Sequence, residues 1–350
     1  MIDLRSDTVT KPTNDMKAFM MNAEVGDDVF EDDPTVIQLE EMAANMFGKE
    51  AGLFCPSGTM TNQIAMMTHL KPGDEVICSR ESHIYNYEGG GIARNAGASV
   101  RLIERKTGLL ELDDVVQNIN PDDVHLPVTK LVALENTCNR GGGNCYDLKA
   151  IKEIKTYCDQ INLPLHLDGA RLFNALVKTE VSSQTMGSFF DSISICLSKG
   201  LGTPLGSVLL GTHSFIKQAR RNRKVLGGGM RQVGIVAAAG IYALNNNVDR
   251  LADDHRHAQL IADALSSCSW VHEVLEVETN IVVAVLNHGC ENDQFINRLK
   301  ENGILAIPFG KGRIRMVTHL DVKESEGKIF LSPFSPRNNE FEIAFLNYVT

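Results

Sequence analysis

The sequence predicts an α/β protein whose main domain is a mainly parallel sheet between helices. Seven short apolar segments alternate with helical segments before residue 246, and this repeated order is typical of a parallel sheet covered on both faces. Beyond Asn245-Asn246-Asn247 the elements become more mixed. We therefore expect a large domain over residues 1–246, whose N-terminal segment contributes to the site, and a small α+β domain over 247–350.

The large domain is predicted element by element. Strands are expected at Gly52–Cys55, Glu75–Ser79, Ser99–Ile103, Leu131–Leu134, Leu165–Leu167, Ile193–Leu197 and Ser207–Leu210. Pro34 begins a run of apolar residues at helical spacing that Gly48 ends, as is usual at the two ends of a helix. Further helices are expected at Thr59–Leu70, Asp147–Gln160, His213–Lys224 and Ile235–Leu244.

The small domain is predicted to begin with a polar helix. This helix lies around Asp249–Ser266, and the segments that follow are Val271–Val277, Ile281–Leu286, a helix near Asp293–Asn302, and strands at Ile304–Ile307 and Arg313–Val317.

Composition narrows the possible partners. The chain has 350 residues, 43% of them apolar, and a formal net charge of −10. This charge argues against nucleic acid or an anionic membrane as a partner, and no apolar stretch is long enough to span a membrane. The eight cysteines form no Cys-x-x-Cys pair, so we expect no metal site, and reduced thiols in a cytoplasmic protein.

The first candidate site lies where the strand ending at Cys55 turns into a helix. Backbone N–H groups at a helix start attract phosphate, and Gly58 would let the phosphate approach closely. This turn predicts an anion site at Gly58 and Thr59. The alternative is an ordinary turn in which Thr59 caps the helix.

The second candidate is Asp168, which ends an apolar strand. A carboxylate there can keep a pyridine nitrogen protonated, as a cofactor that accepts electrons requires. Alternatively, Asp168 caps the following helix. Arg171 either reaches the same pocket or only pairs with Asp168.

The third candidate is Lys199, between an apolar strand and a loop rich in glycine and proline. A lysine in a partly dry pocket can have its pKa lowered enough to form a Schiff base, although most lysines are solvated surface charges. The loop lacks the spacing of a dinucleotide-binding motif.

In this order, the three candidates resemble the low-specificity L-threonine aldolase family, within the fold type I (aspartate-aminotransferase-like) group of pyridoxal-phosphate enzymes. The resemblance extends over nearly all of residues 1–322. Further segments that carry it are Arg5-Ser6-Asp7-Thr8-Val9-Thr10, Val25-Gly26-Asp27-Asp28-Val29, Leu134-Glu135-Asn136-Thr137, Gly227-Gly228-Gly229-Met230-Arg231-Gln232 and Arg315-Met316-Val317-Thr318-His319. It implies the fold type I architecture and pyridoxal 5′-phosphate as cofactor.

The resemblance also implies roles in binding the cofactor. Lys199 would hold the cofactor aldehyde, Asp168 the ring nitrogen, and His83 would stack on the ring. Arg171 would lie near the ring hydroxyl. The expected phosphate ligands are Gly58, Thr59, Lys224 and Arg231, with at least one of the last two coming from a second subunit.

The substrate carboxylate is expected to bind Ser6, Arg171 and Arg315. An arginine suits a carboxylate because it can donate two parallel hydrogen bonds. Arg313 would share a strand face with Arg315, but Arg315 occupies the position that the family uses.

The implied reaction splits L-threonine, L-allo-threonine or another β-hydroxy-α-amino acid into glycine and an aldehyde. His83 and His125 are the candidates for the general base, because imidazole titrates near working pH. The alternatives are β-elimination or transamination on the same fold, and a cofactor-binding scaffold without turnover.

Two departures from the family pattern affect the substrate hydroxyl. Cys138 stands where the family has histidine, and Phe30 where tyrosine is common, so both bear on erythro/threo selectivity. The tail beyond Val322 has no functional interpretation. The resemblance implies a homo-oligomer, a dimer or a dimer of dimers, with active sites shared between subunits.

Overall fold

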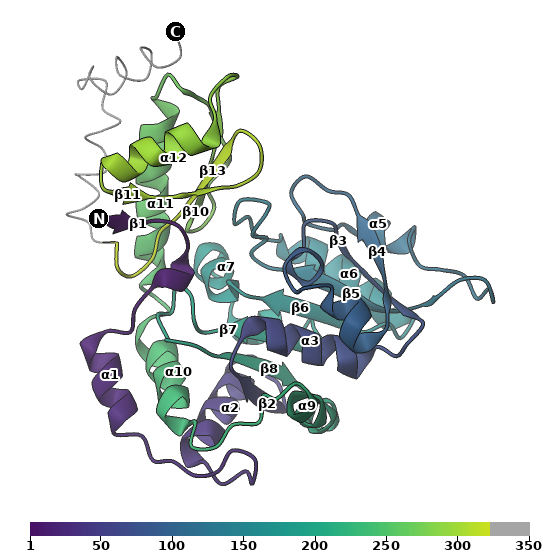
Figure 1. The fold of residues 1–350 in the computed structure, drawn as a ribbon. Helices are drawn as coiled ribbons and strands as arrows, with labels where there is room; N and C mark the ends of the chain where they lie inside the picture. The colour runs from purple at the N-terminus through teal and green to yellow at the C-terminus, as the bar shows by residue number, and fades with distance from the viewer. Residues whose placement is uncertain (323–350) are drawn as a thin grey trace.

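The computed structural model describes residues 1–322, and the tail beyond Val322 lies outside the described residues. Figure 1 shows a large sheet covered by helices and a smaller unit that contains both the first strand and the last strands. No helix within residues 1–322 is long and apolar enough to cross a membrane.

The large domain is built on the predicted seven-stranded sheet, with strand order β2-β8-β7-β6-β5-β3-β4. All pairs are parallel except those that β8 makes with β2 and β7. The mainly parallel sheet expected from the sequence is therefore confirmed. In chain order the strands are β2 (Ala51–Cys55), β3 (Asp74–Ser79), β4 (Ser99–Ile103), β5 (Val128–Glu135), β6 (Leu165–Gly169), β7 (Ser192–Cys196) and β8 (Ser207–Gly211).

Helices cover both faces of this sheet because its strands are apolar on both sides. Val132 and Leu134 of β5 enter one core, whereas Leu131 and Ala133 enter the other, as the alternation of side chains along a strand requires. The first core includes α2 (Pro34–Met46), α6 (Leu148–Gln160), α7 (Leu172–Thr179) and α10 (Gly234–Asn246), and the second includes α3 (Gly58–His69) and α9 (His213–Val225).

Sequence signals at the helix ends agree with the structure. The Asp33 side chain accepts hydrogen bonds from Thr35 and Val36 N–H, and Pro34 opens α2, so an N-cap and an N-terminal proline together fix its start. The other helical elements of the large domain are η1 (Asp7–Val9), α1 (Asn14–Met21), α4 (His83–Asn86), η2 (Ile92–Ala96), α5 (Leu112–Val116) and α8 (Ser183–Gly187).

The small domain has a core of its own. Its sheet has the order β12-β13-β10-β9 and is accompanied by α11 (Leu251–Ser266) and α12 (Asn292–Glu301). The strands are β9 (Val271–Val274), β10 (Ile281–Leu286), β11 (Ile304–Leu305), β12 (Ile307–Pro308) and β13 (Arg313–Val317).

The first residues belong to this small domain. Strand β1 (Ile2–Asp3) pairs in parallel with β11, and Ile2 and Leu4 are buried in the small-domain core. The boundary expected from the sequence groups these residues with the large domain, because a pairing with the far end of the chain leaves no local pattern. The crossing from one domain to the other brings Ser6 and Asp7 to the site.

Candidate active site

Six strands of the large sheet end at one edge. Strand β8 is antiparallel to both β2 and β7, so β2 runs in the same direction as β3, β4, β5, β6 and β7. Residues that follow or end five of these strands are Gly58, His83, Glu135, Asp168 and Lys199. Ligands bind at this edge in parallel α/β sheets. The structure thus brings together the residues that were singled out separately in the sequence.

Lys199 is half-buried, and its ammonium group acts on the pKa values of three neighbouring side chains. Burial raises the pKa of the Cys196 thiol, but the Lys199 ammonium and the hydrogen bonds that the thiol accepts, including those from Ser198, together outweigh this effect and lower the pKa. The same ammonium helps to keep the pKa of Asp7 low and opposes protonation of His83. Lys199 is therefore within electrostatic reach of the N-terminal segment and of the imidazole.

The predicted anion turn opens α3. Ser57, not Thr59, caps this helix by accepting a hydrogen bond from Met60 N–H, so the capping alternative for Thr59 is wrong. A Cβ on Gly58 would lie 3.8 Å from Cys196 Sγ, which places the turn beside the end of β7. Gly58 and Thr59 thus lie at a helix N-terminus next to the segment that carries Lys199.

Lys224 and Arg231 flank a glycine loop that reaches the same turn. A Cβ on Gly228 would lie 2.3 Å from Met60 Sδ, so the loop packs against the first turn of α3. Lys224 is exposed at the end of α9. Arg231 is also exposed and donates to Asp27 Oδ2 at 2.8 Å, so its guanidinium faces outward.

Asp168 is buried at the end of β6. Its Oδ1 accepts from Ala170 N–H at 3.1 Å, and its Oδ2 accepts from Asn62 Nδ2 at 2.8 Å. Asn62 comes from α3, so the carboxylate is tied to the helix that begins at the anion turn. The helix after β6 has Arg171 at its N-cap position, so Asp168 is not the cap.

His83 begins the short helix α4 and is held from two sides. Its backbone N–H donates to Glu135 Oε2 at 2.6 Å, and its Nδ1 lies 3.0 Å from Glu88 Oε1. Burial opposes protonation of the ring, but the hydrogen bond to Glu88 and the Asp168 charge outweigh it and raise the pKa of His83. Burial, with Asp168 nearby, raises the pKa of Glu135 to about 7.

Ligand atoms of His83, Glu88 and Asp168 lie within 4.8 Å of one another. Amide groups of α3 occupy much of this cluster, since Asn62 donates to both carboxylates and Gln63 donates to Glu88. Its hydrogen bonds are those of an orienting network, and the expectation of no metal stays a prediction.

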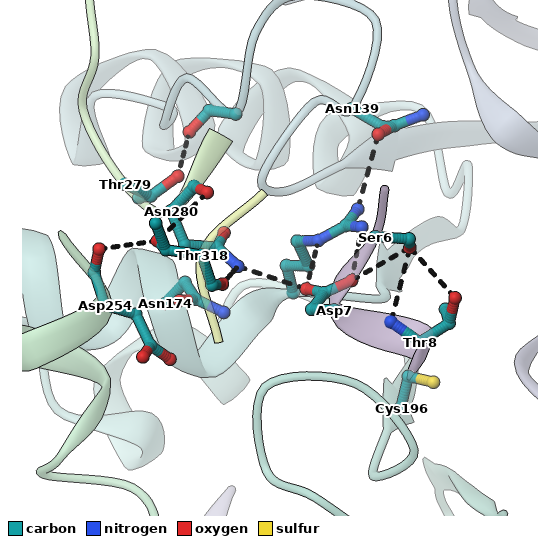
Figure 2. Close-up of polar contacts among 12 residues, drawn as sticks. Ser6, Asp7, Thr8, Asn139, Asn174, Cys196, Asp254, Thr279, Asn280 and Thr318 are labelled. Atoms are coloured by element: carbon teal, nitrogen blue, oxygen red, sulfur yellow. Dashed lines mark hydrogen bonds and ion pairs between the residues drawn. The ribbon is translucent and has the colours of Figure 1, made fainter. Parts of the chain in front are cut away.

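Arg171 forms a buried ion pair with Asp7. Its Nε and Nη2 donate to the two Asp7 oxygens, each at 2.7 Å. Burial disfavours the charged carboxylate, but Arg171 outweighs it and lowers the pKa of Asp7 to about 2. Figure 2 shows Asp7 between Ser6 and Asn280, whose Nδ2 adds a hydrogen bond of 3.1 Å. Both sequence-based alternatives for Arg171 missed this partner.

Arg315 lies beside Arg171, but no carboxylate forms an ion pair with it among the described residues. It donates to Asn139 Oδ1 at 2.8 Å and to Arg5 O at 3.2 Å, while its buried Nε has no hydrogen-bond partner. Burial and the neighbouring Arg171 lower the pKa of Arg315 to about 10. Arg313, on the same strand, is exposed.

Ser6 lies next to these arginines as the N-cap of η1. Its Oγ accepts hydrogen bonds from Thr8 N–H at 3.3 Å and from Thr8 Oγ1 at 2.9 Å, as Figure 2 shows. The hydroxyl is therefore held near Asp7 by local contacts, and its role in binding substrate stays a prediction.

The structure places His125 away from the other candidates of its own chain. It precedes β5, whereas Glu135 ends that strand, and seven steps of a strand separate two points by about 23 Å. Its side chain is 86% exposed and contacts Asp123. This position disfavours His125 as a base for its own subunit, and its role stays a prediction.

The two departures from the family pattern lie in different environments. Cys138 is fully buried, and burial raises the pKa of its thiol, so a reactive thiolate is disfavoured there. Phe30 is 73% exposed in the loop before α2. The effect of both positions on contacts to the substrate hydroxyl stays a prediction.

Sequence reasoning did not assign roles to four residues of the site: Asp7, Asn62, Glu88 and Glu135. Asp7 and Glu135 occur in the segments that carry the family resemblance, which is the one signal that could have found them. Asn62 and Glu88 lie in otherwise ordinary helical and turn sequence, and only the fold shows that they meet.

This fold and this arrangement of lysine, aspartate and arginines define a protein of the fold type I group. The family model described as β-eliminating lyase matches residues 3–288. A probable low-specificity L-threonine aldolase 2 from Arabidopsis thaliana is 42% identical, covering 95% of this chain and 96% of the relative. The low specificity L-threonine aldolase of Escherichia coli strain K12 is 44% identical, covering 93% and 96%.

The chain therefore belongs to the β-eliminating lyase family and, within it, to the low-specificity L-threonine aldolases. A solved structure of Leishmania major threonine aldolase has the same fold, with a TM-score of 0.83 and 22% identity over 95% of this chain and 98% of that one. The fold class expected from the sequence is thus confirmed by both the sheet topology and this comparison.

Proposed function

We propose that this protein cleaves L-threonine and L-allo-threonine to glycine and acetaldehyde, with pyridoxal 5′-phosphate as cofactor. The reaction is a retro-aldol cleavage of the Cα–Cβ bond. The observation that carries the proposal is the pair of buried arginines, Arg171 and Arg315, of which only Arg171 forms an ion pair with the carboxylate of Asp7. This unbalanced positive charge suits the carboxylate of an amino acid.

The residues of the site fit the cofactor. An amine (Lys199), a buried carboxylate (Asp168) and a helix N-terminus at Gly58 are the groups that an aldehyde, a pyridine nitrogen and a phosphate require. Asp168 is fixed by Asn62 and Ala170, so its position does not depend on a ligand. Pyridoxal phosphate, when bound, supplies the electron sink for the electron pair that cleavage leaves on Cα.

Arg315 is the proposed anchor of the substrate carboxylate. Its partnerless Nε and its lowered pKa show a buried cation that lacks an anionic partner, and burying such a charge is costly until one arrives. Ser6 adds a hydroxyl donor from the N-terminal segment. Holding the carboxylate in the plane set by these groups orients the Cα–Cβ bond for cleavage.

His83 is the proposed general base. Its imidazole lies at the edge of the sheet between Glu88 and Asp168, and its pKa is raised above the ordinary value, toward the working pH at which a general base is most effective. It takes the proton from the β-hydroxyl group as the bond to Cβ breaks, and the carbonyl of the aldehyde forms.

A second copy of this chain is the proposed partner. Lys224 lines a groove of about 850 Å³ together with Arg220 and Glu40, and the neighbouring side chains of Phe30 and Val225 are 73% and 76% exposed. Exposed apolar side chains around a groove mark an interaction surface. Docking here would cover the phosphate end of the site and would allow Lys224 or Arg231 to serve the partner.

Aldehyde release tests the proposal. Purified protein with added pyridoxal phosphate is expected to release acetaldehyde from both L-threonine and L-allo-threonine, and Lys199→Ala to abolish release. The ratio of the two rates gives the erythro/threo selectivity. Cofactor absorbance without aldehyde would reject the aldolase, and 2-oxobutanoate with ammonia would favour β-elimination instead.

A further inference from the structure

Glu88 has no assigned role, yet it is the most heavily contacted carboxylate near His83. Its side chain is fully buried in the turn after α4. Oε1 accepts from Asn62 Nδ2 at 2.9 Å, and Oε2 accepts from Gln63 Nε2 at 2.6 Å. Both oxygens thus receive an amide donor, which suits the ionised form, since an ionised carboxylate only accepts hydrogen bonds.

The two amides are themselves oriented. Gln63 Oε1 accepts from Asn95 Nδ2 at 2.9 Å, which fixes the amide so that Nε2 faces Glu88. Asn62 uses one Nδ2 for both Glu88 and Asp168, and it lies on the same helix as Gln63. Helix α3 therefore sets the position of Glu88 in the absence of substrate.

His83 is the third partner of Glu88, and this contact determines its tautomer. Nδ1 lies 3.0 Å from Oε1, so with an ionised carboxylate Nδ1 must be the donor. In the neutral ring the other nitrogen, Nε2, then carries the lone pair. The groups that face His83 are Glu88 from its own segment, Glu135 and Asp168 from β5 and β6, Lys199 from the loop after β7, and the ring of Tyr87 at 5.5 Å.

We propose that Glu88 is the positioning residue of His83: it holds the imidazole proton on Nδ1 and leaves Nε2 to take the proton from the substrate hydroxyl. In this step the hydroxyl O–H bond breaks, an Nε2–H bond forms, and the positive charge that results on the ring is stabilised by Glu88. The inference deepens the proposed function and rests on it for the identity of the proton donor.

The test is a residue-specific titration that does not depend on turnover. Exchange of deuterium at the imidazole C2 atom of each histidine, read by mass spectrometry in the holoenzyme across pH, gives the pKa of His83. Glu88→Gln is expected to lower it by about 1 pH unit, because an opposite charge at hydrogen-bond distance favours the charged ring. Glu88→Asp keeps the charge and is expected to retain most of the wild-type value.

Kinetics of the same variants separate positioning from folding. Glu88→Gln is expected to lower kcat about 10- to 100-fold, the loss typical when the hydrogen-bond partner that orients a metal-ligating imidazole is removed, with little change in KM for L-threonine. The acidic limb of the pH profile should move to lower pH together with the pKa of His83. Glu104→Gln, at a surface pair with Arg80, is the matched control and should change neither quantity.

An unchanged pKa of His83 in folded Glu88→Gln would overturn the inference, even if kcat falls, since the loss would then be structural. If Glu88→Gln does not fold, Glu88→Asp decides: a pKa far below the wild-type value rejects the role of the charge. A wild-type protein that shows the titration but releases no aldehyde would reject the proposed function and leave the Glu88–His83 contact standing.

Discussion

Asp7 and Arg171, 164 residues apart in the sequence, form a bidentate ion pair with two distances of 2.7 Å. Asp7 comes from the segment that leaves the small domain, and Arg171 from the turn after β6. The pair therefore joins the two domains at the site. It also holds the second arginine, Arg315, next to a carboxylate that is already engaged, which leaves positive charge for the substrate.

We expect Asp7→Asn to destabilise the protein by about 3 kcal/mol or more, because it leaves buried arginine charges without their carboxylate. The measurement is the free energy of unfolding in urea at neutral pH. Asp3→Asn, which removes a pair with the exposed Arg5, is the control and should have little effect. Equal effects of the two substitutions would contradict the role of burial.

The same pair predicts a loss of stability in acid. The pKa of Asp7 is lowered from 3.8 to about 2 in the folded protein, so its contribution is present above the unfolded value and is lost as the pH falls through that window. The difference in unfolding free energy between wild type and Asp7→Asn should therefore shrink between these two values. A difference that is constant across that range would argue against the ion pair.

Arg315 and Arg313 offer a matched comparison for carboxylate binding. Arg315→Lys should raise KM for L-threonine about 10- to 100-fold, since a charged hydrogen bond contributes about 1.5–3 kcal/mol and lysine cannot replace an arginine fork. Arg313→Lys, at the exposed first residue of the same strand, should leave KM unchanged. Similar KM values for the two variants would place the carboxylate elsewhere.

His83 and His125 are distinguished by substitution to asparagine. His83→Asn should lower kcat about 100- to 10,000-fold, the usual contribution of general base catalysis. Because His125 is exposed at the opposite end of β5, His125→Asn can lower kcat only if its loop serves a second subunit. A large loss for His125→Asn and none for His83→Asn would reverse the assignment.

Shared sites predict complementation between inactive variants. If Arg231 serves the partner, a mixed dimer of Lys199→Ala and Arg231→Ala contains one intact site. Random reassociation of equal amounts should then restore about a quarter of wild-type activity, since half of the dimers are mixed and each has one of two sites. Recovery that stays at the level of the separate variants would mean that each subunit uses its own Arg231.

Much of the fold could be predicted from the sequence because local patterns determine its elements. Each of the seven strands occurs within a few residues of the expected position, and α2 begins at Pro34 as its cap signals indicate. The pairing of β1 with β11 was not predictable in this way. This pairing depends on which strand, far away in the sequence, has an unpaired edge. A strand of two residues is also too short to show an alternating pattern.

The site was predictable from the order of its residues along the chain. Asp168 and Lys199 each have an ordinary structural alternative, but together with the turn at Gly58 they form the pattern that resembles the family. Asp7 and Glu88 were not predictable, because their role arises from partners on other elements: Arg171 for one, and the amides of α3 for the other. His125 shows the converse: its residue type suits a general base, but it precedes the strand that Glu135 ends, at the opposite edge of the sheet.

The products formed from L-threonine test the central claim most directly. Retro-aldol cleavage predicts glycine and acetaldehyde in equal amounts, with no added keto acid and no ammonia, and loss of both products in Lys199→Ala. Ammonia with 2-oxobutanoate, or a requirement for a keto acid, would contradict it and would assign elimination or transamination to the same lysine.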